Sequence, residues 1–194
     1  MGVCCVVYAV SDQNLDAILA DPPLVWRVVE PDDDSSYLEA LEAAARPSFM
    51  HRLLGRRAAP VEPKSLPLDG PQRRFVDLDK SWDGLNRVLT TLVPSAPAFF
   101  DAPTCPGGIE VGYGPAMYQR SDVVSALATA WAGLLQADLR QALATTDFSG
   151  AYLESVWKQR DGEALAYLSE NFAGLQAFLA LAQTHRLGTL IQMT

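Results

Sequence analysis

Hydrophobic positions along this chain of 194 residues repeat with two different spacings, one typical of strands and the other typical of helices. Runs rich in β-branched and aromatic residues predict strands. The predicted strands cover residues 2–10, 74–78, 109–113, 116–119 and 187–193. Because strands are expected at both ends of the chain, we predict one small mixed sheet that includes both terminal strands.

Between the strands, apolar residues recur three and four positions apart, as they do on the buried face of a helix. Ser11, and Ser35 or Ser36, are predicted to cap two early helices, and Asp79 to cap a later one over residues 80–92. The C-terminal half is helix-rich, with helices expected over residues 121–135, from residue 138, over 152–157, and as a pair between 161 and 185. Several helices packed against one small sheet give an α+β fold in a single domain over residues 1–194.

One long segment, residues 55–72, contains four prolines and no apolar repeat, which predicts a Pro-rich loop. We place no domain boundary there, because the segments on either side are each too small to close a hydrophobic core alone. Positive charge gathers on and beside this loop, since residues 46–74 contain seven Lys and Arg residues but only two Asp and Glu residues. The segment is either an interaction surface or a solvated helix end and loop.

The charge of the whole chain excludes two classes of partner. Fifteen Lys and Arg residues against 23 Asp and Glu residues give a net charge of −8. Such a surface repels nucleic acids and anionic membranes, so neither is expected as a partner. Because residues 46–74 carry a charge of +5, the remainder carries −13, and this acidic body is the surface expected to attract a basic protein.

The sequence shows no recognisable targeting signal. Its start lacks the basic residues of a signal peptide, and no window reaches the roughly 20 apolar residues of a membrane span. The three cysteines match neither a disulfide framework nor a zinc-binding spacing. We therefore expect a cytoplasmic protein with reduced cysteines and without a bound metal ion or cofactor.

The segment Asp77-Leu78-Asp79-Lys80-Ser81-Trp82-Asp83-Gly84-Leu85 resembles the signature of the bacterial YfbM-like family, a domain family of unknown function. Four weaker pieces follow the order of that family, at residues 8–11, 112–118, 167–172 and 188–191. The resemblance implies a small cytosolic α+β domain and brings no established activity. Members of the family often carry histidine where Asp83 or Asn86 stands, which implies that a site built on imidazoles would be missing here.

The carboxylates of this signature offer the most specific candidate chemistry in the chain. Asp77 and Asp79 are two residues apart, so on an extended segment they share a face and could bind Mg²⁺ or Ca²⁺ or provide a general base. Lys80 would lie beside them at the start of a helix, and Asp83 in the first turn of that helix is a further candidate binding residue. Tyr113 and Tyr118 flank a turn and are candidates to line the same site.

Local structure offers a different explanation of the same residues. Asp79 would cap the helix, and Asp77 would accept hydrogen bonds from the neighbouring backbone or from Lys80. Asp83 would interact favourably with the dipole at the start of the helix, and Trp82 would anchor the apolar stripe in the core. The sequence leaves both interpretations open.

Two functions from different classes follow from these observations. The first is a non-catalytic protein-binding module, in its most concrete form an immunity protein that neutralises a bacterial toxin through its acidic surface. The second is an enzyme, or a small-ligand or metal-binding protein, with a site around Asp77, Asp79, Lys80 and Tyr113 or Tyr118. The net charge and the lack of a convincing catalytic set favour the first, and neither argument predicts an oligomeric state.

Overall fold

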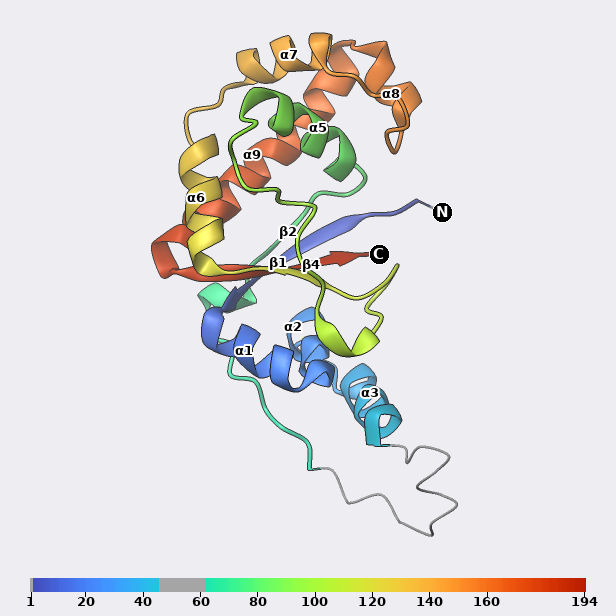
Figure 1. The fold of residues 1–194 in the computed structure, drawn as a ribbon, viewed down its shortest axis with the longest axis vertical. Coiled ribbons are helices and arrows are strands. Elements are labelled where there is room, and N and C mark those ends of the chain that lie inside the picture. Colours follow the sequence, from blue (N-terminus) through green and yellow to red (C-terminus); the bar gives the residue numbers. More distant parts are fainter. Residues whose placement is uncertain (1, 46–61) are drawn as a thin grey trace.

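The structure, a computed structural model, describes residues 2–45 and 62–194, and the architecture below concerns those residues (Figure 1). At its centre is a four-stranded sheet with the strand order β2-β1-β4-β3. The terminal strands lie side by side, with Cys5 opposite Met193 and Ser11 opposite Leu187. The four strands are β1 (Cys5–Ser11), β2 (Phe75–Asp77), β3 (Met117–Gln119) and β4 (Leu187–Met193).

This sheet confirms the predicted α+β fold class and the inclusion of both terminal strands. One difference is that a mixed sheet is predicted, whereas every pairing among the four strands is antiparallel. Hydrophobic patterns identify a strand but do not fix the direction in which it returns after a helical connection. The strand predicted at 109–113 is absent from the described sheet: this segment forms one bridge, from Glu110 to Pro115, and Tyr113 N–H donates to the Met193 carbonyl at 2.7 Å.

Five helices lie on one side of the sheet, some packed against the strands and the others packed on those helices. Where the sequence predicts a pair of helices, α9 is one continuous helix of 24 residues. Gly174 near its middle does not break the helix, and a Cβ there would make an ordinary van der Waals contact with Val76 at 3.4 Å. The five helices are α5 (Trp82–Leu92), α6 (Ser121–Trp131), α7 (Gln136–Thr145), α8 (Glu154–Gln159) and α9 (Gly162–His185).

The helices that follow β1 cover the opposite face. Ser11 caps the first of them as predicted, because its side chain accepts a hydrogen bond from the backbone N–H of Asn14 at 3.1 Å. The buried Asn14 amide in turn donates to the Pro67 carbonyl at 2.9 Å and to Gln72 Oε1 at 2.8 Å. These elements are α1 (Asp12–Ala20), the 3-10 helix η1 (Pro22–Val25), α2 (Trp26–Val29) and α3 (Ser35–Ala45), with two further 3-10 helices, η2 (Pro71–Arg73) and η3 (Pro106–Gly108), in loops.

Side chains of β1 alternate between two hydrophobic clusters, one on each face of the sheet. Cys5, Val7 and Ala9 belong to the larger cluster with α5 to α9, whereas Val10 belongs to the smaller cluster with α1 to α3. Both faces are therefore buried, and the sheet lies between two helical layers (Figure 1). Within the described residues, no helix combines the length and the apolar character that a membrane crossing requires.

The predicted loop at 55–72 lies partly outside the described residues, as do four of the seven Lys and Arg residues between 46 and 74. Its described part is residues 62–72, of which 62–70 contain no helix or strand and the last two belong to η2. The hydrogen bonds from Asn14 fix the end of this loop against α1.

Candidate functional site

The signature segment forms a tight turn between β2 and α5. Asp79 lies within that turn with φ of 45°, a left-handed conformation that is uncommon for residues other than glycine. The prediction that Asp79 caps the following helix is therefore wrong, because α5 begins at Trp82 and Ser81 occupies the cap position. The buried Ser81 hydroxyl donates to the Leu78 carbonyl at 2.7 Å, which closes the turn.

The Asp79 carboxylate joins this turn to α9 and to the first residues of the chain. It accepts hydrogen bonds from the Tyr167 hydroxyl at 2.7 Å and from the Cys4 thiol at 3.3 Å. The Tyr167 hydroxyl, together with the thiol, lowers the pKa of Asp79. Burial, followed by the hydrogen bond to Asp79, raises the pKa of Tyr167. The arrangement therefore favours an ionised carboxylate and a neutral phenol.

Three other members of the signature make contacts within the turn or across to its neighbours. Asp77 is exposed, and its Oδ1 accepts a hydrogen bond from the backbone N–H of Asp79 at 2.7 Å. Asp83 Oδ2 accepts from the backbone N–H of Tyr152 at 2.6 Å and lies 3.4 Å from Nε of Arg87. The Lys80 side chain runs beside the start of the chain, since a Cβ at position 2 would lie 2.6 Å from its Cε.

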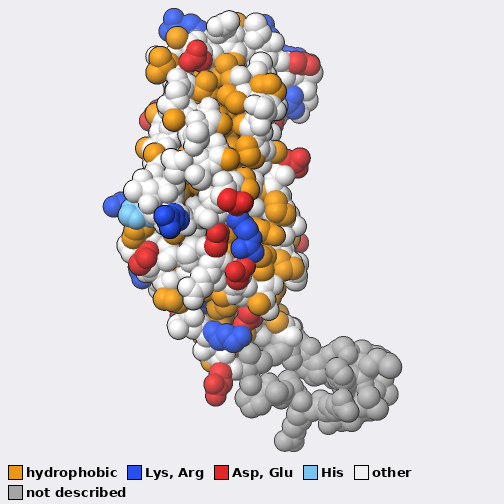
Figure 2. Space-filling view, turned by 60° about the vertical axis from the view of Figure 1, so that its left-hand side comes forward, with side chains coloured by type: hydrophobic (Ala, Val, Ile, Leu, Met, Phe, Trp, Pro, Cys, Tyr) orange, Lys and Arg blue, Asp and Glu red, His pale blue; other side chains and the backbone are white. Residues whose placement is uncertain are grey.

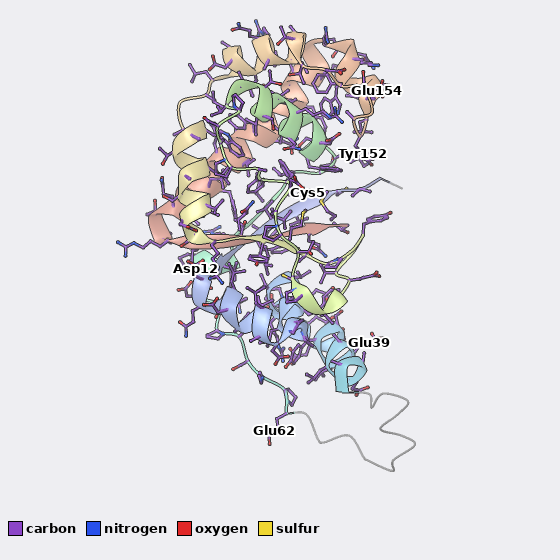
Figure 3. All side chains as sticks on the ribbon, viewed as in Figure 1. Cys5, Asp12, Glu39, Glu62, Tyr152 and Glu154 are labelled. Atoms are coloured by element: carbon purple, nitrogen blue, oxygen red, sulfur yellow. The ribbon has the colours of Figure 1, made fainter. Side chains whose placement is uncertain are left out.

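Aromatic residues complete this assembly. Trp82 Nε1 donates to the Val3 carbonyl at 3.1 Å, and its ring stacks on Tyr152 with a centroid distance of 5.7 Å. The Tyr152 hydroxyl accepts from the backbone N–H of Val3 at 2.7 Å, and Figure 3 shows Tyr152 beside the start of the chain. Gly84 lies against the ring of Trp157, where a Cβ would approach to 2.6 Å. We call residues 77–84 with Tyr152, Trp157 and Tyr167 the signature clamp.

The structure brings four of the six candidate site residues together and leaves two apart. Asp77, Asp79, Lys80 and Asp83 all lie in the signature clamp, at the β2 edge of the sheet. Tyr118 lies on β3, at the opposite edge, and packs against the smaller hydrophobic cluster. Tyr113 is 59 % exposed in the loop that precedes β3. In the part of the chain that the structure describes, no group of three or more His, Cys, Asp or Glu residues could hold a metal ion.

Four cavities found among the described residues have linings that contain none of the clamp carboxylates, and three of these cavities bear on the argument. One of about 390 Å³ separates α6 from α9 and is lined mainly by alanines, with Trp131. One of about 170 Å³ lies between the end of α5 and residues 93–100. Both have uncharged linings, and Figure 2 shows hydrophobic side chains gathered over the upper half of the face it draws. The third, of about 300 Å³, lies between α2, η2 and the β1–β2 pair, and is the only one of these three with charged residues, Asp32 and Arg73, in its lining.

A second feature is a concentration of exposed acids at one end of the molecule. In the sequence, the run Asp32-Asp33-Asp34 marks this region. Residues 28–45 contain six Asp and Glu residues and no Lys or Arg. Five of the six carboxylates are exposed, and Glu39, labelled in Figure 3, lies on α3 at the end far from the clamp. We call residues 28–45 the acidic end. The fold is needed to show that α3 adds Glu39 and Glu42 to the same region, because no sequence spacing places them beside this run.

Comparison with known proteins adds a family assignment. The sequence model of the family described as "Domain of unknown function (DUF1877)" matches residues 1–192. This match confirms the expectation that a domain family of unknown function spans the chain, while the YfbM-like resemblance stays a prediction. No curated protein and no solved structure gives a significant match.

Proposed function

We propose that this chain, which belongs to the DUF1877 family, is a non-catalytic protein-binding module that engages a basic partner through its acidic end. The observation that carries the proposal is the set of exposed carboxylates between residues 28 and 45, which no Lys or Arg of that segment balances. A concentrated negative field attracts a cationic protein and accelerates its association.

The excess of acids over bases among the described residues supports the proposal. Four of the 15 Lys and Arg residues lie in residues 46–61, and none of the 23 Asp and Glu residues does. The described residues therefore contain 11 bases and 23 acids, and the acidic end alone contributes six of those acids. A basic partner gains most by approaching where acids are densest and least neutralised.

Ion pairs neutralise only part of the acidic end. Asp34 pairs with Arg27, and Asp32 lies 3.2 Å from Arg73. Asp33 accepts a hydrogen bond from the backbone N–H of Ser35 at 2.8 Å, which lowers its pKa and favours the ionised form at the start of α3. Among the described side chains, no Lys or Arg lies within ion-pair distance of Asp33, Glu39 or Glu42.

The hydrogen bonds of the signature clamp support a binding role over a catalytic one. Asp77, Asp79 and Asp83 each accept at least one hydrogen bond from within the chain, and α9, the Tyr152 loop and the turn itself provide these donors. Such contacts give these residues a part in folding that needs no substrate. The concrete form we favour is an immunity protein that neutralises a basic bacterial toxin.

The test is coexpression with the products of neighbouring genes, followed by pull-down and by a growth assay for protection from any toxic product. We expect a basic product to bind, and binding to weaken when Asp33→Asn, Glu39→Gln and Glu42→Gln are combined. A matched control removes the same number of charges elsewhere and should retain binding: Asp101→Asn, Glu110→Gln and Glu170→Gln. Equal binding by both triple variants, or no basic product bound, contradicts the proposal, and binding without protection excludes the toxin version.

A further inference from the structure

We infer that the outer edge of β2 binds an extended, basic segment of a partner protein, which adds to the sheet as a fifth strand. The inference rests on the proposed function and specifies how the partner is held. It draws on backbone geometry, an exposed aromatic side chain, a neighbouring cavity and local charge, and the acidic end contributes residues to the lining of that cavity.

Hydrogen bonds on the inner side of β2 show which backbone groups point outward. Ala9 N–H donates to the Arg74 carbonyl and Leu78 N–H donates to the Cys5 carbonyl, each at 2.9 Å. In an antiparallel pair, alternate residues point their backbone groups toward the partner strand. With Val76 opposite Val7 in this register, the N–H and C=O groups of Phe75 and Asp77 point away from β1.

The two edges of the sheet differ in their coverage. At the other edge, the Tyr118 N–H donates to the Pro103 carbonyl at 2.9 Å, and the Gln119 amide donates to the Ala98 carbonyl at 2.8 Å. Residues 98–103 therefore cover β3. No comparable segment among the described residues hydrogen-bonds to the outer side of β2, and both Phe75 and Asp77 are exposed. An open strand edge is a template for pairing with another chain.

A site for one apolar side chain lies directly beside this edge. Phe75 is 62 % exposed, and its ring contacts that of Tyr8 with a centroid distance of 6.0 Å. The two rings form one wall of the cavity of about 300 Å³, whose other lining includes Val28 and Leu68. In strand addition, backbone hydrogen bonds hold the added segment and a pocket of this kind selects one of its side chains.

The charge around the edge favours a basic segment. Asp77 projects from the same face of β2 as Phe75, two residues along the strand. The carboxylates of Asp77 and Glu30 both act on Tyr8, adding to the larger effect of burial in raising the pKa of its phenol. Asp32 at the cavity is already paired with Arg73, and the exposed Arg74 just before β2 would repel a base at that end, so Asp77 is the position at which a base fits. A Lys or Arg beside Asp77 and an apolar residue beside Phe75 therefore suit this edge.

The experiment uses the full chain and a phage-displayed library of random decapeptides. We expect enriched peptides to share an apolar residue and, two positions away, a Lys or Arg. A synthetic copy of the most enriched peptide, labelled with fluorescein, is then titrated with the protein by fluorescence polarisation. Phe75→Ala should weaken its binding more than tenfold, as loss of a central aromatic contact does. Leu135→Ala, at a side chain that is 67 % exposed elsewhere, is the matched control and should not change it.

A second substitution tests the backbone pairing separately. Phe75→Pro removes both the aromatic ring and the backbone N–H of residue 75, which points away from β1. The hydrogen bonds between β2 and β1 do not use that N–H, so an edge strand tolerates proline at this position. Binding should be weaker for Phe75→Pro than for Phe75→Ala, with an unchanged circular dichroism spectrum. If proline unfolds the chain, the comparison of Phe75→Ala with Leu135→Ala decides alone. No peptide enrichment, or enriched peptides that bind Phe75→Ala as they bind the original protein, overturns the inference.

The two proposals fail in distinguishable ways. If the basic partner binds and responds to the acidic-end variants but not to Phe75→Ala, strand addition is wrong and the proposed function stands. If peptides bind at β2 without any preference for Lys or Arg, the charge argument for this edge is wrong, whereas the proposed function is decided by the acidic-end variants.

Discussion

Replacing Tyr167 with phenylalanine removes one oxygen atom from the centre of the signature clamp and should reduce the free energy of unfolding by about 2 kcal/mol. The hydroxyl donates to the Asp79 carboxylate at 2.7 Å and accepts from the backbone N–H of Lys80 at 3.1 Å. The ring itself is kept, so its stack on Trp157, with a centroid distance of 5.9 Å, should persist.

The magnitude follows from the two hydrogen bonds. A hydrogen bond to a charged group contributes about 1.5–3 kcal/mol to stability, and an ordinary one about 1 kcal/mol. Asp79 is only half-buried, so water replaces part of the lost interaction and keeps the total near the lower end. For a chain of this size, about 2 kcal/mol corresponds to a melting temperature lower by roughly 4–8 °C.

Urea unfolding followed by circular dichroism measures this change. The midpoint should fall while the slope stays constant, because the surface exposed on unfolding is unchanged. Tyr113→Phe is the matched control, since Tyr113 is 59 % exposed, and it should leave the midpoint in place. A loss below about 0.5 kcal/mol, the range of ordinary surface substitutions, would refute the view that this hydroxyl stabilises the clamp.

Three further predictions concern packing, pH and thiol reactivity. Gly84→Ala should destabilise the chain by about 1–3 kcal/mol in urea unfolding, because the added Cβ would lie 2.6 Å from the Trp157 ring. The control Gly133→Ala should leave stability unchanged, because a Cβ there meets nothing within 4 Å. The lowered pKa of Asp79 provides stability that is present above the unfolded pKa of about 4 and is lost as pH falls through the lower folded pKa. Unfolding curves between about pH 3 and pH 6 should therefore depend less on pH in Asp79→Asn, and identical pH dependence would contradict this assignment. Burial raises the pKa of Cys5 to about 12 and of Cys105 to about 11, so neither thiol should react readily with Ellman's reagent at about pH 8 until guanidinium unfolds the chain.

The elements with the clearest patterns could be predicted from the sequence. The final strand was predicted at residues 187–193 and forms there, and the helix-rich C-terminal half and the cap at Ser11 also follow from local signals. Local signals do not report direction or continuity, which depend on packing across the whole chain. For that reason the sheet is antiparallel rather than mixed, and one helix replaces the pair predicted over residues 161–185.

The candidate site could be predicted only in part, because its residues are separated by long stretches of sequence. Asp79 and Tyr167 are 88 residues apart, and no spacing rule links them. Ser81, not Asp79, occupies the position before α5, since the turn holds Asp79 in a left-handed conformation and its carboxylate accepts a hydrogen bond from Tyr167 on α9. Tyr113 and Tyr118 were grouped with Asp77 although β3 and β2 occupy opposite edges, and strand order is not visible in a single sequence.

The association rate with the basic partner tests the central claim, that the acidic end directs binding, most directly. Stopped-flow measurement at several salt concentrations should give a rate constant that falls by about tenfold or more from low to physiological salt. The combined Asp33→Asn, Glu39→Gln and Glu42→Gln variant should bind more slowly at low salt and respond less to salt, with unchanged unfolding. A rate that is independent of salt, or equal rates for this variant and the original protein, would contradict the claim.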